Sequence, residues 1–217
     1  MIAMAHDTNH LIAGLVEDLK PASPLRFGRG IALMLAALVL TVGLATLGFG
    51  VRDDVATGHP DTMFILAGGI FLLLGLACMA ACVAMSSPRV GSGRNGWGWA
   101  AAMASLLPLS AVVVAMIEGR PAWQASEPDH GVLCMAFSVA LGLIVGIALT
   151  AWLQRGAPAS PERAGLLTGI AAGAAGVVAF TFVCPINSIM HIGLWHGMAV
   201  TVSALAGWLI VPRLVRW

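Results

Sequence analysis

The stretch VLCMAFSVALGLIVGIALTAWL, residues 132–153, contains 22 residues and no charged side chain. An α-helix rises 1.5 Å per residue, so this run is about 33 Å long, which matches the roughly 30 Å hydrocarbon core of a bilayer. Similar apolar runs occur at residues 31–50, 63–85, 97–117, 164–184 and 191–211. The whole chain is 59% hydrophobic and 10% charged, with a mean hydropathy of +0.92, which is outside the range of soluble domains. The sequence therefore predicts an all-α integral membrane protein with six transmembrane helices.

The basic residues predict how this bundle is oriented. Cytoplasmic loops of membrane proteins are enriched in Lys and Arg. With six spans both termini lie on one side of the membrane. Nine of the 11 basic residues lie in the termini and in the loops on that side, and only Arg52 and Arg120 lie on the other, outer side. We therefore expect both termini in the cytoplasm. The net charge of +1 excludes a broadly basic surface, so we expect no direct binding of nucleic acid.

The opening segment HDTNHLIAGLVEDLKPASPL, residues 6–25, has the pattern of a short water-facing helix. Its apolar residues recur at helical spacing and form one face, consisting of Leu11, Ile12, Leu15, Val16 and Leu19. An isolated helix of about 12 residues is marginal in water, so this helix needs a surface to lie on. The sequence thus predicts a cytoplasmic segment 1–29 with an amphipathic helix, followed by a transmembrane domain 30–217.

Three surfaces could receive this helix. A membrane interface fits poorly, because interfacial helices are usually rich in Lys and Arg, whereas Glu17 and Asp18 are adjacent acids. The chain's own cytoplasmic loops are short and offer little apolar area. A partner protein with a hydrophobic groove is the interpretation we favour, with the apolar face as the docking surface.

Two of the four cysteines lie at the same expected depth. Cys134 and Cys184 are each about 20 residues from the short loop that joins their two runs, so equal helical rises place both near the outer surface. The short loop predicts an antiparallel hairpin, which brings the sulfurs near one another. Such a pair could form a disulfide, bind a soft metal or simply be buried as small hydrophobic residues. Cys78 and Cys82, toward the inner side, are interpreted as ordinary buried cysteines.

Three histidines lie at a similar depth and are candidate metal ligands beside these cysteines. His130 precedes Cys134 by four residues and could share its helix face. His191 and His196 enter the last run, but five residues on an α-helix correspond to a rotation of about 140°, so one ion is not expected to use both. The alternative for each is a hydrogen-bonded histidine at the membrane interface. No cofactor is required by the sequence; a thiophilic metal ion is the one it could accommodate.

No catalytic motif is present, so the sequence gives no indication of an enzyme. No run carries a charged residue near its centre, and pumps and coupled transporters usually need such groups. A small six-span transporter or channel nevertheless remains the alternative function.

Several motifs together resemble the NrsF-type family of membrane anti-sigma factors. They are LIAGLVEDLKP at 11–21, LQRGAPASPERAG at 153–165, CPINS at 184–188, LWHGMA at 194–199 and the terminal PRLVRW. The resemblance implies a six-span protein of the bacterial inner membrane that sequesters an extracytoplasmic-function sigma factor through its N-terminal segment. It also implies that Cys134 and Cys184 match the family's two outer cysteines, and we expect them to sense a periplasmic redox or heavy-metal signal.

Overall fold

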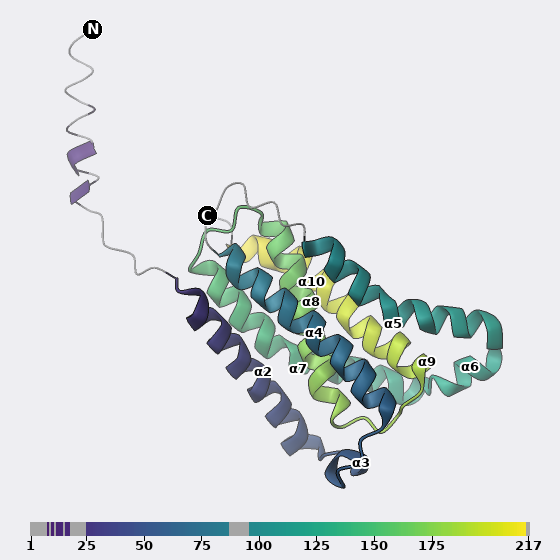
Figure 1. Ribbon diagram of the computed structural model, residues 1–217. Coiled ribbons are helices and arrows are strands. Elements are labelled where there is room, and N and C mark those ends of the chain that lie inside the picture. Colours follow the sequence, from purple (N-terminus) through teal and green to yellow (C-terminus); the bar gives the residue numbers. More distant parts are fainter. Residues whose placement is uncertain are drawn as a thin grey trace.

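The computed structural model describes residues 25–86 and 96–215, and residues 8, 10, 12–14, 16 and 17; side chains at 96–101, 104, 107 and 122 are not described. Every regular element in these ranges is a helix (Figure 1). In chain order they are α2 (Phe27–Phe49), α3 (Asp53–Ala56), α4 (Thr62–Met85), α5 (Gly96–Glu118), α6 (Arg120–Ala125), α7 (Pro128–Gln154), α8 (Pro161–Thr181), α9 (Ile189–His191), the π-helix η1 (Ile192–His196) and α10 (Gly197–Val215). The expected all-helical class is confirmed for the described residues.

Five helical stretches of the described chain are long and apolar enough to cross a bilayer. They are α2, α4, α7, α8 and the continuous stretch Ile189–Val215, which comprises α9, η1 and α10. These coincide with five of the six expected runs and indicate a multi-pass membrane protein. The expected span at 97–117 corresponds to α5, but its described apolar stretch, Pro108–Glu118, is shorter than a span. The six-span arrangement is therefore not confirmed.

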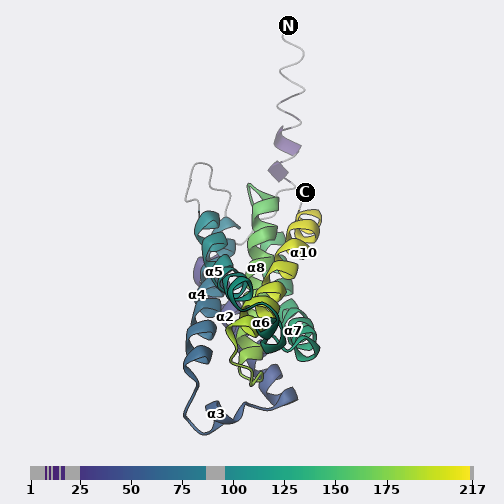
Figure 2. The same ribbon diagram turned by 90° about the vertical axis from the view of Figure 1, so that its right-hand side faces the viewer.

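The helix α5 departs from the direction of the others. It contains Pro108, which removes one helical hydrogen bond and commonly kinks a helix. The helix starts beside α4 and α10 and then diverges, so that its second half and α6 project to one side of the bundle (Figures 1 and 2). Within this projection Ala111 packs against Met190 of α9. The projection therefore remains attached to the start of the last transmembrane stretch.

The helix α8 lies at the centre of the bundle, between α4, α7 and α10. In α8, 94% of the most apolar 18-residue stretch is buried inside the bundle, whereas in α7 the corresponding share is 28%. Close packing against α10 depends on glycines: a Cβ at Gly165 would lie 2.6 Å from the Gly207 carbonyl oxygen, and one at Gly173 would lie 2.7 Å from the Val200 Cα. Small residues of this kind let transmembrane helices approach closely. The position of α8 fixes where its last residues, just before Cys184, emerge from the bundle.

Candidate functional site

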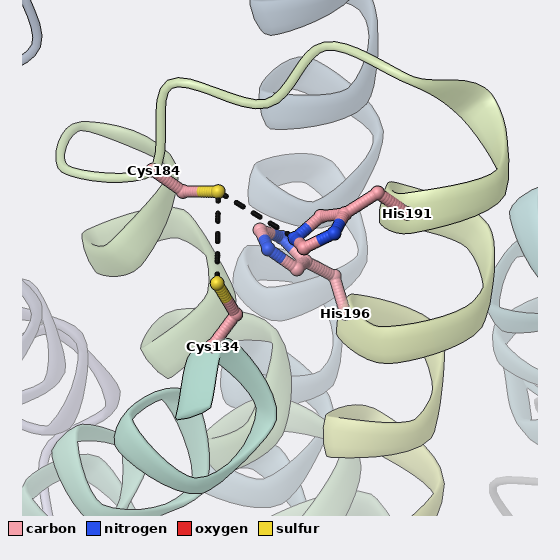
Figure 3. Close-up of side chains that lie close together, drawn as sticks. All are labelled: Cys134, Cys184, His191 and His196. Carbon is pink, nitrogen blue, oxygen red and sulfur yellow. Dashed lines mark hydrogen bonds between the residues drawn. The ribbon is translucent and has the colours of Figure 1, made fainter. Parts of the chain in front are cut away.

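Four buried side chains meet at the end of the bundle away from the end of α10, and Figure 3 shows them converging. They are Cys134 of α7, Cys184 just after α8, His191 just before the π-helix η1, and His196 at its end. The π-helix η1 is called the π-turn below. Their four ligand atoms all lie within 4.8 Å of one another. The Sγ atoms of Cys134 and Cys184 are 3.7 Å apart, and the Cys184 Sγ lies 3.6 Å from the His191 Nε2. Elements far apart in the sequence thus supply two sulfur and two imidazole groups to one small volume.

The two sulfurs are close but not bonded. A disulfide has an S–S distance near 2.05 Å, and all four cysteines of the chain are free. The equal depth expected from the lengths of the two runs agrees with the observed proximity of the sulfurs. Phe180 packs with both cysteines, and Leu141, Val183 and Ile186 close the apolar side of the cluster.

The histidines share a face because the helix is locally a π-helix. On an α-helix, residues 191 and 196 would be separated by about 140°. A π-helix bonds residue i to residue i+5, so with about 4.4 residues per turn the same spacing gives a separation of only about 50°. The rings of His191 and His196 accordingly lie 5.5 Å apart between centroids. The geometric argument against their acting together therefore does not apply to this structure.

The orientation of His191 is fixed by the chain that follows α6. Its Nδ1 lies 2.8 Å from the carbonyl oxygen of Ser126, which can only accept, so Nδ1 carries the proton and donates. The Nε2 lone pair therefore faces Cys184. The indole Nε1 of Trp195 donates to the same carbonyl at 3.0 Å, and its ring occupies the space beside Gly131. Ser126 thus connects α6 and α7 to the π-turn.

Cys184 is positioned through its backbone by Arg52. The Arg52 Nη1 donates to the Cys184 carbonyl oxygen at 2.8 Å, and the Arg52 backbone N–H donates to the Phe182 carbonyl oxygen at 3.0 Å. The guanidinium group is ion-paired with Asp54 and also donates to the Asn187 side chain at 2.9 Å. These bonds hold the chain that follows α8, at Phe182 and Cys184, against the loop between α2 and α4.

Asp54 in α3 is held in its ionised form by this network. The hydrogen bond from Arg52 is the largest cause that lowers its pKa, from an ordinary value of 3.8 to about 2, and the backbone N–H of Asp61 contributes further. The charge on Asp54 therefore persists at any ordinary pH and keeps Arg52 directed toward Cys184.

The other candidate residues lie elsewhere. His130 is exposed, and its Nδ1 lies 3.5 Å from the Glu127 carboxylate rather than in the cluster. Cys82 is buried with its Sγ 3.6 Å from the Thr168 hydroxyl, and Cys78 is buried beside it in α4. On the opening helix, Ile12 and Val16 are helical and exposed, whereas residues 11, 15 and 19 lie outside the described residues.

Sequence reasoning did not identify Arg52, Ser126 or Trp195 as parts of the site. Arg52 gave one usable signal: it is one of only two basic residues on the predicted outer side, and it stands beside Asp53 and Asp54. Ser126 acts through its backbone carbonyl, so its side chain carries no signal in the sequence.

The fold and this site define a multi-pass helical membrane protein with a buried thiol and imidazole cluster at one end. The sequence model of the NrsF family, described as negative regulator of sigma F, matches residues 15–217. The chain therefore belongs to the NrsF family, a family of regulators of a sigma factor. No curated protein and no solved structure matches the chain significantly.

Proposed function

We propose that this protein is a membrane-bound anti-sigma factor that sequesters an extracytoplasmic-function sigma factor at the inner membrane. The observation that carries the proposal is the family match over residues 15–217, which covers all the described bundle and names a sigma factor as the target of regulation. The apolar helices supply the membrane anchor. Both termini face the cytoplasm in this proposal, because the basic residues cluster on that side.

The sigma factor is held by the opening segment. Ile12 and Val16 are four residues apart, so they lie on one face of a helix, and their side chains are 52% and 59% exposed. Apolar side chains in this arrangement typically dock into a hydrophobic groove of a partner. The acidic Glu17 is also exposed and favours a partner surface over an anionic membrane surface.

The signal acts at Cys134 and Cys184, on the periplasmic side. The two thiols are 3.7 Å apart, close enough to act as one unit through oxidation or through binding of a thiophilic metal ion. Either event joins α7 to the segment after α8. The sigma factor is released to the extent that the event favours one arrangement of the bundle over another.

The packing of α8 offers a physical connection across the membrane. Its outer end leads directly into Cys184, and its inner end contacts α10 through Gly165 and Gly207. These helices meet backbone to backbone, so they are expected to move as a unit rather than to deform independently.

The test is retention of the sigma factor by the full chain purified in detergent micelles. Replacing Ile12 and Val16 together with Asp should abolish retention, because charged side chains cannot be buried in an apolar groove without a large cost. Glu17→Gln is the matched control on the same helix and should retain the partner. If the double variant still retains the sigma factor while remaining monodisperse, the opening helix is not the docking element.

A further inference from the structure

We propose that Cys134, Cys184, His191 and His196 together form a four-coordinate site for one soft divalent cation of the Zn²⁺ and Cd²⁺ class. This inference deepens the proposed function, on which its regulatory meaning rests, because it specifies the ligand set and the ion at the signal-sensing end. The binding chemistry itself follows from the four side chains alone.

The distances fit tetrahedral coordination. For metal–sulfur bonds of about 2.3 Å and metal–nitrogen bonds of about 2.0 Å, a tetrahedron places two sulfurs about 3.8 Å apart and a sulfur and a nitrogen about 3.5 Å apart. The observed separations are 3.7 Å between the two Sγ atoms and 3.6 Å between the Cys184 Sγ and the His191 Nε2. The remaining ligand pairs lie within 4.8 Å, so closing the tetrahedron needs displacements of about 1 Å.

His196 supplies an independent observation that points to a ligand. Its side chain is 1% exposed, and within the described chain neither of its ring nitrogens has a hydrogen-bond partner. A buried polar group without a partner destabilises the folded state, so buried imidazoles are normally paired. In Figure 3 the ring points toward the other three side chains. A cation bound among them would give His196 the partner that it lacks.

The surroundings of His191 have the form expected around a metal-binding histidine. Such residues usually donate their second ring N–H to a backbone carbonyl or a carboxylate, which fixes the tautomer and orients the ring. Here Nδ1 donates to the Ser126 carbonyl at 2.8 Å and leaves Nε2 for the ion. Arg52 fixes the backbone of Cys184 in a comparable way, through the carbonyl oxygen at 2.8 Å.

The charges and the chemical type of the ligands select the class of ion. Binding converts two thiols to thiolates and releases two protons, and two thiolates with a divalent cation and two neutral imidazoles have no net charge. A neutral site is the least costly to bury. Thiolate and imidazole together favour Zn²⁺ and related soft ions over Mg²⁺ or Ca²⁺, which prefer oxygen ligands.

Four protein ligands leave no open coordination position, which is the arrangement of a structural rather than a catalytic site. The ion would therefore hold the chain after α8, the start of α7 and the π-turn together. It would also keep both sulfurs as thiolates bound to metal, so that metal binding and formation of a disulfide between them exclude one another.

Titration of the reduced, chelator-treated full chain in detergent micelles with Co²⁺ tests the site. Cobalt in a tetrahedral site with two sulfurs and two nitrogens shows intense visible absorption and a thiolate charge-transfer band. We expect one Co²⁺ per chain, release of two protons per ion, and displacement by one equivalent of Zn²⁺ or Cd²⁺. Absence of the charge-transfer band in reduced wild-type protein would overturn the proposal.

Substitutions distinguish a metal site with four ligands from a site formed by the two cysteines alone. Cys134→Ser and His196→Asn should each weaken Co²⁺ binding by more than about 100-fold. Loss of a residue that only hydrogen-bonds to a metal ligand already lowers metal affinity 10- to 100-fold, and a ligand itself should matter more. His130→Gln and Cys78→Ser are the matched controls and should bind like wild type. An unchanged spectrum and affinity in His196→Asn would show that the histidine is not a ligand.

The same preparations distinguish failure of this inference from failure of the proposed function. Retention of the sigma factor is measured in parallel, without metal. Metal binding without any retention of the sigma factor would refute the anti-sigma proposal and support the metal site. Retention of the sigma factor without metal binding would refute the metal site and support the anti-sigma proposal. The thermal midpoint of each variant is recorded, and His196→Gln provides a second substitution if His196→Asn does not fold.

Discussion

At the scale of single residues, Arg52 connects the end of the bundle that carries the Cys and His cluster to the loop between α2 and α4. Its side chain is buried among the oxygens of the Cys184 carbonyl, the Asn187 amide and the Asp54 carboxylate. Its role is to position Cys184, which it contacts through the carbonyl oxygen rather than through sulfur. The cluster therefore depends on residues that carry no thiol or imidazole.

Replacement of Arg52 should loosen the end of α8. Arg52→Gln removes the bonds to the Cys184 carbonyl and the Asn187 side chain, and we expect a loss of about 1–3 kcal/mol in the free energy of unfolding. The exposed Arg120→Gln should change stability by less than about 0.5 kcal/mol. Equilibrium unfolding in mixed micelles measures both variants, and equal stabilities would show that the Arg52 network contributes nothing.

The ion pair between Arg52 and Asp54 gives a dependence on pH. The pKa of Asp54 is about 2 in the folded protein and 3.8 without the pairing, so the folded state stabilises the ionised carboxylate. This contribution is complete above the unfolded pKa and is lost as pH falls from about 4 to about 2. The thermal midpoint of wild type should therefore fall in this interval more steeply than that of Asp54→Asn. Parallel curves for the two proteins would contradict the assignment.

Among the candidate residues, some positions could be inferred from the sequence and others could not. The proximity of Cys134 and Cys184 follows from their similar distances along the chain, about 20 residues each, from the short loop between their two apolar runs. The pairing of His191 with His196 could not be inferred, because the sequence gives no sign of a π-turn and α-helical spacing separates them. The contribution of Ser126 could not be inferred either, because it acts through its backbone carbonyl, which every residue has.

At the scale of elements, the π-turn and the glycine contacts decide how the last helix is placed. The π-turn accommodates one more residue than an α-helical turn, and the following α10 packs against α8 in a register fixed by Gly165 and Gly207. The five apolar spans were predicted from length and composition. The third apolar run was not confirmed as a span, because the described apolar stretch of α5, Pro108–Glu118, is shorter than a span.

Deleting Gly193 should convert the π-turn into an α-helical turn. The two histidines would then be four residues apart and still share a face, so we expect a folded protein that binds Co²⁺ within about tenfold of wild type. Deleting the exposed Val202 is the matched control. This residue lies within α10, where no π-helical turn can compensate for the deletion. The part of α10 after residue 202 should therefore lose its register against α8, and the protein should lose stability. Equal damage from the two deletions would refute this view of the π-turn.

The contact between α8 and α10 should not tolerate added volume. A Cβ at Gly165 would meet the Gly207 carbonyl oxygen at 2.6 Å and Pro212 Cδ at 2.9 Å, so Gly165→Ala should cost about 1–3 kcal/mol. At Gly43 on α2 no atom of the described residues lies within 4 Å of an added Cβ, and Gly43→Ala should be neutral or stabilising by up to about 1 kcal/mol. Similar unfolding curves for both variants would contradict the close packing.

At the scale of the whole molecule, the arrangement separates two proposed functions across a membrane. The Cys and His cluster lies at one end of the bundle, and α2 begins and α10 ends at the other end. Composition and the distribution of charge indicated this plan from the sequence, but the orientation itself remains a prediction. Reporter fusions at the N-terminus, near Arg94, near Arg155 and at the C-terminus should all report a cytoplasmic location. A periplasmic signal at any of these sites would contradict the proposed topology.

The most direct test of the central claim measures release of the sigma factor in response to metal at the cluster. The reduced, metal-free full chain in nanodiscs is loaded with the sigma factor, and Cd²⁺ is added as the probe. We predict that Cd²⁺ releases the sigma factor from wild type and from Cys78→Ser, but not from Cys134→Ser or Cys184→Ser. Equal release from all four proteins, or no release from wild type, would contradict the account.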